Sequence, residues 1–125
     1  MKNQTYRMTM LFDFYGETLT ERQKEFFDLY YNEDLSLGEI ARQMNVSRQN
    51  VHDLIARSSE KLRACEAALG AAGRMERMLE RLAGVQELLG AIAGQDIPTE
   101  ARALTDEAVR QIQRIQQEEE DAHGL

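Results

Sequence analysis

Apolar residues recur at the spacing of an α-helix along almost the whole chain, and this pattern restricts the fold more than any other feature. Nowhere do β-branched and aromatic residues alternate with polar ones over the length of a strand. Thr20 with Gln23, and Ser36 with Glu39, have the spacing of a capping box, which marks the start of a helix. The sequence therefore predicts an all-α protein.

The first part of the chain predicts two helices that share an aromatic core. The first is expected from about residue 5 to residue 15, with Gly16 at its end, and the second begins after Thr20. Their predicted apolar faces comprise Met8, Leu11, Phe12, Tyr15, Phe26, Phe27, Tyr30 and Tyr31. Because seven of the eight Phe and Tyr residues lie within residues 12–31, we expect the main core here.

The stretch SLGEIARQMNVSRQNVHDL, residues 36–54, has the pattern of a helix-turn-helix. Asn45 tolerates the left-handed backbone conformation that a tight corner requires. Val46 is expected to fill the corner, and Ser47 to cap the next helix. That helix is expected to continue to about Gly70. Its predicted inward stripe is Val51, Leu54, Ile55, Ser58, Leu62, Cys65 and Leu69.

The C-terminal half predicts two amphipathic helices joined by a short turn. GAAG, residues 70–73, is the expected break before them, and Pro98 fits the first turn of the last helix after a turn at residues 94–98. The two predicted apolar seams are Met75, Met78, Leu82, Val85, Leu89 and Ile92, then Ala101, Leu104, Ala108, Ile112 and Ile115. The first seam is apolar over about five turns. We therefore expect an antiparallel hairpin that pairs with a second copy in a homodimer, or folds back on the first domain.

The domain organisation expected from these features has three parts. Residues 1–70 form a helix-turn-helix domain, residues 74–120 form the helical hairpin, and residues 121–125 form a frayed tail. The acidic run at residues 118–121 has two readings: a solvated helix end, or a mimic of nucleic-acid charge that masks Arg48 and Arg57.

The second helix of the helix-turn-helix carries most of the side chains expected to contact nucleic acid. Gln49 and Asn50 are suited to reading adenine edges, and Arg48 or Arg57 to reading guanine or holding phosphate. Asp53 can accept a hydrogen bond from cytosine, but it also repels phosphate. The predicted set is Arg42, Arg48, Gln49, Asn50, His52, Asp53, Arg57 and Lys61. The alternatives are that the motif is only a scaffold, or that its surface contacts another protein.

Two resemblances follow from these motifs. The pattern of Glu39, Ile40, Ala41, Met44, Val46, Ser47 and Val51, with Asn45 where Gly is usual, resembles the DNA-binding region 4 of bacterial sigma factors. Over residues 8–55, including LFDFYG, LYY and VSRQ, the chain is more closely similar to the YlxM-type helix-turn-helix proteins of bacteria. That resemblance implies a sigma-region-4-like fold and an accessory role in the signal recognition particle pathway, with components of the particle as partners.

Charge and composition limit the remaining classes. The formal net charge is -7, but residues 64–125 carry -6 of it and residues 32–63 are neutral, so the motif itself is not acidic. The chain has no phosphate-binding loop, no dinucleotide fingerprint and no nucleophile–base pattern, and its two histidines and one cysteine lack metal-ligand spacing. We expect no enzyme activity, cofactor, metal or small-molecule substrate. No apolar run approaches the ~20 residues of a membrane helix, and no secretory signal is evident, so a cytoplasmic location is expected.

Overall fold

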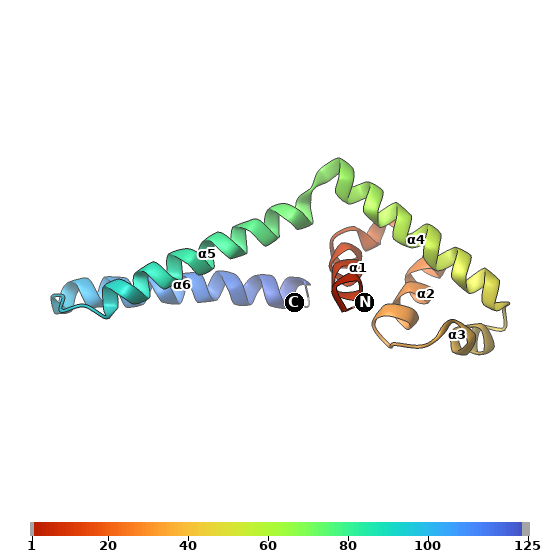
Figure 1. The fold of residues 1–125 in the computed structure, drawn as a ribbon, viewed down its shortest axis with the longest axis horizontal. Helices are drawn as coiled ribbons and strands as arrows, with labels where there is room; N and C mark the ends of the chain where they lie inside the picture. Colours follow the sequence, from red (N-terminus) through yellow and green to blue (C-terminus); the bar gives the residue numbers. More distant parts are fainter. Residues whose placement is uncertain (1, 124–125) are drawn as a thin grey trace. The chain divides into compact units, whose positions relative to one another are not determined.

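The computed structural model describes residues 2–123 of the 125-residue chain. Its helices are α1 (Lys2–Tyr15), α2 (Glu21–Tyr31), α3 (Leu37–Met44), α4 (Arg48–Leu69), α5 (Ala71–Ala93) and α6 (Thr99–His123), with a short 3-10 helix η1 (Gly16–Thr18) after α1 (Figure 1). No strand occurs in this part of the chain, which confirms the all-α prediction.

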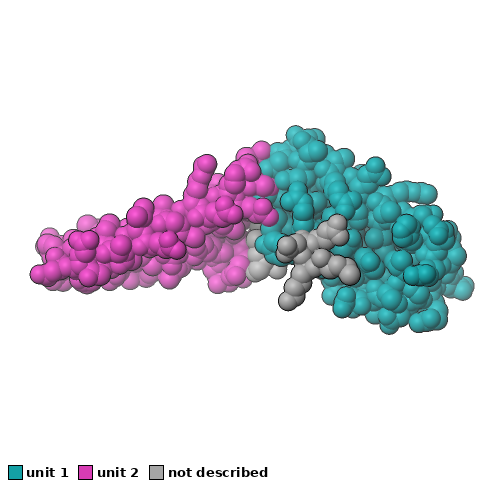
Figure 2. Space-filling view, viewed as in Figure 1, with its two compact units in different colours: residues 1–72 teal, residues 73–125 magenta. Residues whose placement is uncertain are grey.

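The chain divides into two compact units, Met1–Ala72 and Gly73–Leu125 (Figure 2). The first unit contains α1 to α4 and the first two residues of α5. The second contains the rest of α5, the turn after it, and α6, which runs back in the opposite direction (Figure 1). Of the expected tail, residues 121–123 continue α6, and Gly124 and Leu125 lie outside the described residues.

Helix α4 is the central helix of the first unit, because α1, α2 and α3 all contact it. Its buried side chains Val51 and Ile55 join a cluster with Phe26, Leu29, Ile40 and Ala41 from α2 and α3. The rings of Phe12 and Phe27 stack with centroids 4.7 Å apart, which joins α1 to α2. The aromatic core predicted for residues 12–31 is therefore confirmed.

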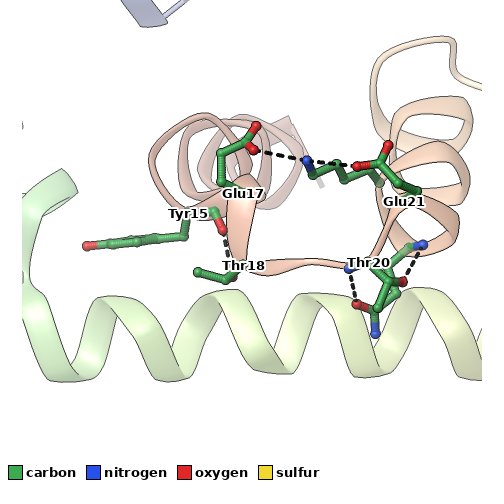
Figure 3. A network of polar contacts seen from close by, with 7 residues as sticks. Tyr15, Glu17, Thr18, Thr20 and Glu21 are labelled. Carbon is green, nitrogen blue, oxygen red and sulfur yellow. Dashed lines mark hydrogen bonds and ion pairs between the residues drawn. The ribbon is translucent and has the colours of Figure 1, made fainter.

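The corner between α1 and α2 is fixed by local polar contacts (Figure 3). The Thr18 hydroxyl donates to the Tyr15 carbonyl at 2.7 Å, and Lys24 pairs with Glu17 at 3.1 Å. Thr20 and Gln23 form the predicted capping box, in which each side chain accepts from the other's backbone N–H (Figure 3). Gly16 lies against Phe12: a Cβ at this position would come within 3.2 Å of the ring.

The helix-turn-helix corner has the predicted geometry. Ser36 and Glu39 form the second capping box at the start of α3. Asn45 ends α3 in the left-handed conformation, with φ 56° and ψ 49°. Val46 packs against the core cluster, and the Ser47 hydroxyl accepts the backbone N–H of Asn50 at 3.1 Å, which caps α4.

A polar clasp joins the end of α4 to the start of α5. Helix α4 ends at Leu69 and is capped by Gly70, whose φ of 63° is left-handed. Helix α5 begins at the next residue, so residues 71–73 are helical where a longer break was expected. The Tyr15 hydroxyl donates to the Glu66 carboxylate at 2.5 Å and accepts the Ala71 N–H at 3.0 Å. The same carboxylate oxygen accepts the Ala72 N–H at 3.1 Å.

The predicted apolar stripes of the longer helices are only partly correct. Leu69, in the last turn of α4, is 59% exposed rather than buried. In the second unit, the inward residues are half-buried Met75, Leu79, Leu82, Leu89, Ala101, Ala108 and Val109, with Thr105 and Ile112 buried. The predicted seam residues Met78, Val85, Ile92, Leu104 and Ile115 are exposed instead. Helical spacing identifies residues that share a face, but the turn between two helices decides which edge of that face turns inward.

The turn between α5 and α6 is held by Arg102. Its guanidinium donates to the carbonyls of Ala93 at 2.5 Å and Gln95 at 3.0 Å. Pro98 lies one residue before α6 rather than within its first turn, and its carbonyl accepts the N–H of Arg102 at 3.0 Å. Among the described residues, none of the helices combines the length and apolar character that crossing a membrane demands.

Candidate nucleic-acid interface

The first turns of α4 project from the helix-turn-helix with their polar side chains outward. Val51 is fully buried and Ile55 is 6% exposed, so the inward face of this end is closed by packing. The polar residues of this end lie on the remaining faces of the helix and are all exposed: Arg48, Gln49, Asn50 and His52. The cap at Ser47 and the corner at Asn45 therefore present the start of α4 as a helix-turn-helix requires.

The structure distributes the predicted site residues over two hollows on either flank of α4. The first, about 360 Å³, is lined by Thr20, Arg22, Gln23, Phe26, Asn50, Asp53, Leu54 and Arg57. The second is lined by Leu37, Arg48, Gln49 and His52. Arg42, near the end of α3, and Lys61, further along α4, are exposed but line neither hollow. Six of the eight predicted residues thus line one or other of the two hollows, three in each.

Arg22 is a candidate that the sequence pattern did not reveal. Its guanidinium lies over the ring of Phe26, one turn later in α2, at 4.9 Å from the ring centroid. This contact positions the cation beside the hollow that Arg57 also lines. The i, i+4 spacing of Arg22 and Phe26 is a sequence signal for their contact, but only the packing of α2 on α4 places Arg22 at this site.

Asp53 holds two neighbouring side chains of the candidate interface. Its carboxylate accepts a hydrogen bond from the side-chain amide of Gln49 at 2.9 Å, and the Nδ1 atom of His52 lies 3.4 Å from the same oxygen. The bond from Gln49, followed by the contact with His52, lowers the pKa of Asp53. The carboxylate is half-buried rather than fully outward, and its charge is partly satisfied within the helix.

The arrangement has the chemistry for reading a groove between two phosphate strands. The amides of Gln49 and Asn50 are near the tip of α4, and arginines lie on both flanks, with Arg48 on one side and Arg57 and Arg22 on the other. Amide side chains hydrogen-bond to base edges, and arginines hold phosphate or guanine. One N–H of the Gln49 amide is taken by Asp53, so its carbonyl oxygen and second N–H remain for a ligand.

Metal-binding groups are not assembled in residues 2–123: no cluster of three or more His, Cys, Asp or Glu side chains occurs there. Cys65 is half-buried, and its sulfur lies 3.9 Å from the Thr18 hydroxyl. Cys65 and Thr18 therefore contact each other within the first unit.

The capped helices, the left-handed corner and the exposed start of α4 define a helix-turn-helix protein. Residues 2–91 match the family described as "Putative helix-turn-helix protein, YlxM / p13 like", and the chain belongs to this family. The resemblance drawn from residues 8–55 is thereby confirmed, and the match extends through most of α5.

Several curated bacterial relatives support the assignment. The UPF0122 protein of Symbiobacterium thermophilum is 47% identical over 98 residues, which cover 78% of this chain and 89% of that protein. A UPF0122 protein of Desulforamulus reducens is 43% identical over 93 residues, covering 74% and 80%. A UPF0122 protein of Acetivibrio thermocellus is 36% identical over 119 residues, covering 95% and 96%, so this similarity includes α6.

Proposed function

We propose that this protein is a non-enzymatic, cytoplasmic accessory factor that binds nucleic acid through the start of α4. The observation that carries the proposal is the exposure of Arg48, Gln49, Asn50 and His52 at the tip of a correctly cornered helix-turn-helix. By family resemblance the proposed context is the signal recognition particle pathway, in which the ligand would be the structured RNA of the particle.

Roles within the site follow from chemistry and position. Gln49 and Asn50 contact base edges, while Arg48 either specifies guanine or holds phosphate. Arg42, His52, Arg57 and Lys61 hold phosphate, together with Arg22 from α2. Asp53 acts by orienting Gln49 and His52, a role supported by its contacts with both.

The charge of the site favours selective over general binding. Glu60 is exposed on the outer face of α4, about two turns beyond Asp53, and both carboxylates oppose phosphate. A protein that coats nucleic acid without preference usually presents an unbroken basic surface. We therefore expect weak binding to most sequences and stronger binding to few.

The proposed organisation assigns this function to residues 1–70. The hairpin at residues 74–120 would serve in dimerisation or folding back, and residues 121–125 would be a terminal tail that takes no part in binding. In this organisation the hairpin takes no part in the proposed contacts of Arg48, Gln49 and Asn50.

The decisive experiment is a fluorescence anisotropy titration of labelled signal recognition particle RNA and labelled duplex DNA over a salt series. We expect binding to the RNA that weakens steeply as salt rises, because each phosphate contact releases counterions. Arg48→Ala should weaken binding, whereas Arg7→Ala, which removes an exposed arginine from α1, should not. Absence of binding to both ligands at low salt would refute the proposal.

Two alternatives predict different outcomes of the same titration. A preference for duplex DNA would indicate a DNA-binding transcriptional regulator. An adaptor that binds protein is favoured by Asp53 and Glu60 on the outer face of α4, and it would bind neither nucleic acid. Such an adaptor would bind a component of the particle through an interface that depends little on salt.

A further inference from the structure

The hairpin of α5 and α6 leaves one large apolar surface uncovered. Six side chains of this surface, which we call the apolar face, are 39–74% exposed: Met78, Val85, Leu88, Ile92, Leu104 and Ile115. Among residues 73–122, whose burial the structure describes, only Thr105 and Ile112 are buried. A two-helix unit that encloses so few side chains gains little hydrophobic stabilisation by itself. The apolar face is therefore expected to be covered.

The apolar face lies on one side of the hairpin. On α5, Met78 lies three positions after the inward-facing Met75, and Val85 lies three positions after the inward-facing Leu82. On α6, Ile115 follows buried Ile112 by the same three positions. In two antiparallel helices, positions with the same heptad offset from the inward seam lie on the same side. The exposed residues of the two helices are thus adjacent rather than on opposite surfaces.

The two borders of the apolar face carry opposite charges. Along α5 the border is basic, with Arg74, Arg77 and Arg81. Along α6 it is mainly acidic, with Glu100, Glu107 and Glu118, although Arg114 lies between the last two and Glu107 pairs with Arg110 at 2.9 Å within the helix. The acidic residues of α5, Glu76, Glu80 and Glu87, fall on the opposite side of that helix by their spacing. The apolar face is therefore balanced in charge, although the unit as a whole is acidic.

We propose that the apolar face is the interface with a second copy of this chain. A two-fold axis parallel to the hairpin places α5 of one copy against α6 of the other, so all neighbouring helices are antiparallel. The basic border of each copy then meets the acidic border of its partner, with Arg77 at the same end of the hairpin as Glu118. Within the described residues, neither of these two side chains makes an ion pair.

A second copy fits this face better than an unrelated partner because the apolar residues and the two charged borders of the face are complementary to those of an identical face. Rotation about the axis pairs apolar residues with apolar residues and arginines with glutamates, as an isologous interface requires. The spacing of three and four residues along α5 is also the spacing of helix bundles. This inference does not depend on nucleic-acid binding by α4.

The apolar part of the proposal is tested by sedimentation velocity on the full chain over a micromolar dilution series. The wild type should be a dimer, and Val85→Asp should dissociate at a concentration at least about tenfold higher, because it places a charge in a dry interface. Ala83→Asp places the same charge on an exposed position outside the apolar face and should leave the dimer intact. Circular dichroism should show that both variants remain helical.

The orientation of the two copies is tested by exchanging charges between the borders. Arg77→Glu with Arg81→Glu, and separately Glu107→Arg with Glu118→Arg, should each weaken the homodimer. An equimolar mixture of the two double variants should recover dimers, because opposite charges then meet at both borders. If the mixture stays monomeric but a single chain with all four substitutions forms dimers, the charges act within the hairpin and not between copies.

Three results would overturn the proposal. A wild-type monomer throughout the micromolar range would mean that another part of the chain or another partner covers the apolar face. Dimers of equal stability for the wild type and Val85→Asp would place the interface elsewhere. A mixture of border variants that remains monomeric would refute the two-fold arrangement.

Discussion

The carboxylate of Asp53 accepts a hydrogen bond from the side-chain amide of Gln49 at 2.9 Å, one turn earlier on the exposed face of α4. This contact changes the effect expected of an acidic residue on a candidate recognition helix. A free carboxylate would only repel phosphate, whereas this one also restricts the orientation of an amide that can read base edges. The pair is therefore the best place to separate affinity from selectivity.

We predict that Asp53→Ala strengthens binding to unrelated sequences but reduces discrimination among sequences by about tenfold, since a lost base contact costs about that factor. Anisotropy titrations against a panel of RNA and DNA sequences measure both quantities. Glu60→Ala is the matched control, because it removes a carboxylate from the same outer face without a contact to Gln49. It should raise affinity for all sequences equally, and an equal loss of discrimination in both variants would contradict the positioning role.

At the helix-turn-helix corner, we predict opposite preferences for alanine and glycine at two nearby positions. Asn45 has φ 56°, so Asn45→Ala should destabilise the protein by about 1 kcal/mol, while Asn45→Gly should be nearly neutral. Gln43 is an exposed residue inside α3, and there glycine should be worse than alanine by about 1 kcal/mol. Urea unfolding gives all four values. The same order of glycine and alanine at both positions would be inconsistent with the left-handed corner.

The clasp at the start of α5 predicts a dependence of stability on alkaline pH. Burial, followed by the hydrogen bond to Glu66, raises the pKa of Tyr15 above its ordinary value of 10.0. Because the folded state holds this proton more tightly than the unfolded state, the contribution is complete below pH 10 and declines as pH rises through the raised pKa. Stability should therefore fall above pH 10.

Tyr15→Phe tests this dependence. At neutral pH it should lower the free energy of unfolding by about 1–2 kcal/mol, because the Ala71 N–H loses its acceptor. Above pH 10 it should lose less stability than the wild type, so the two curves converge. Urea unfolding between pH 7 and pH 11 measures the difference. Tyr6→Phe removes an exposed hydroxyl and should reproduce the wild-type curve. If the curve of Tyr15→Phe ran parallel to that of the wild type up to pH 11, ionisation of Tyr15 would not be the cause of the alkaline loss of stability.

The local features of this fold are predictable from sequence because they depend on residues a few positions apart. The capping box of Thr20 and Gln23 and the left-handed Asn45 need no knowledge of distant packing. The same is true of most of the exposed residues at the start of α4. Once Val51 and Ile55 are assigned to the core, helical geometry alone turns Gln49 outward.

The features that sequence alone does not determine depend on how helices pack. Met78 and Met75 share an apolar stripe on α5, but only the hairpin turn decides that Met75 is half-buried and Met78 is 53% exposed. Leu104 is 74% exposed for the same reason, although its spacing fits the predicted seam of α6. Arg22 joins the candidate site only because the start of α2 lies beside α4.

Arg22 provides the last prediction, since it separates the contribution of charge from that of position. If it holds phosphate, Arg22→Ala should weaken binding and reduce the slope of log affinity against log salt by about one. Arg22→Lys keeps the charge but loses the planar contact with Phe26, so it should restore most of the salt slope and only part of the affinity. Arg7→Ala, on α1, controls for the change in net charge and should leave the slope unchanged. A slope for Arg22→Ala equal to that of the wild type would remove Arg22 from the interface and restrict phosphate contact to the basic side chains of α3 and α4.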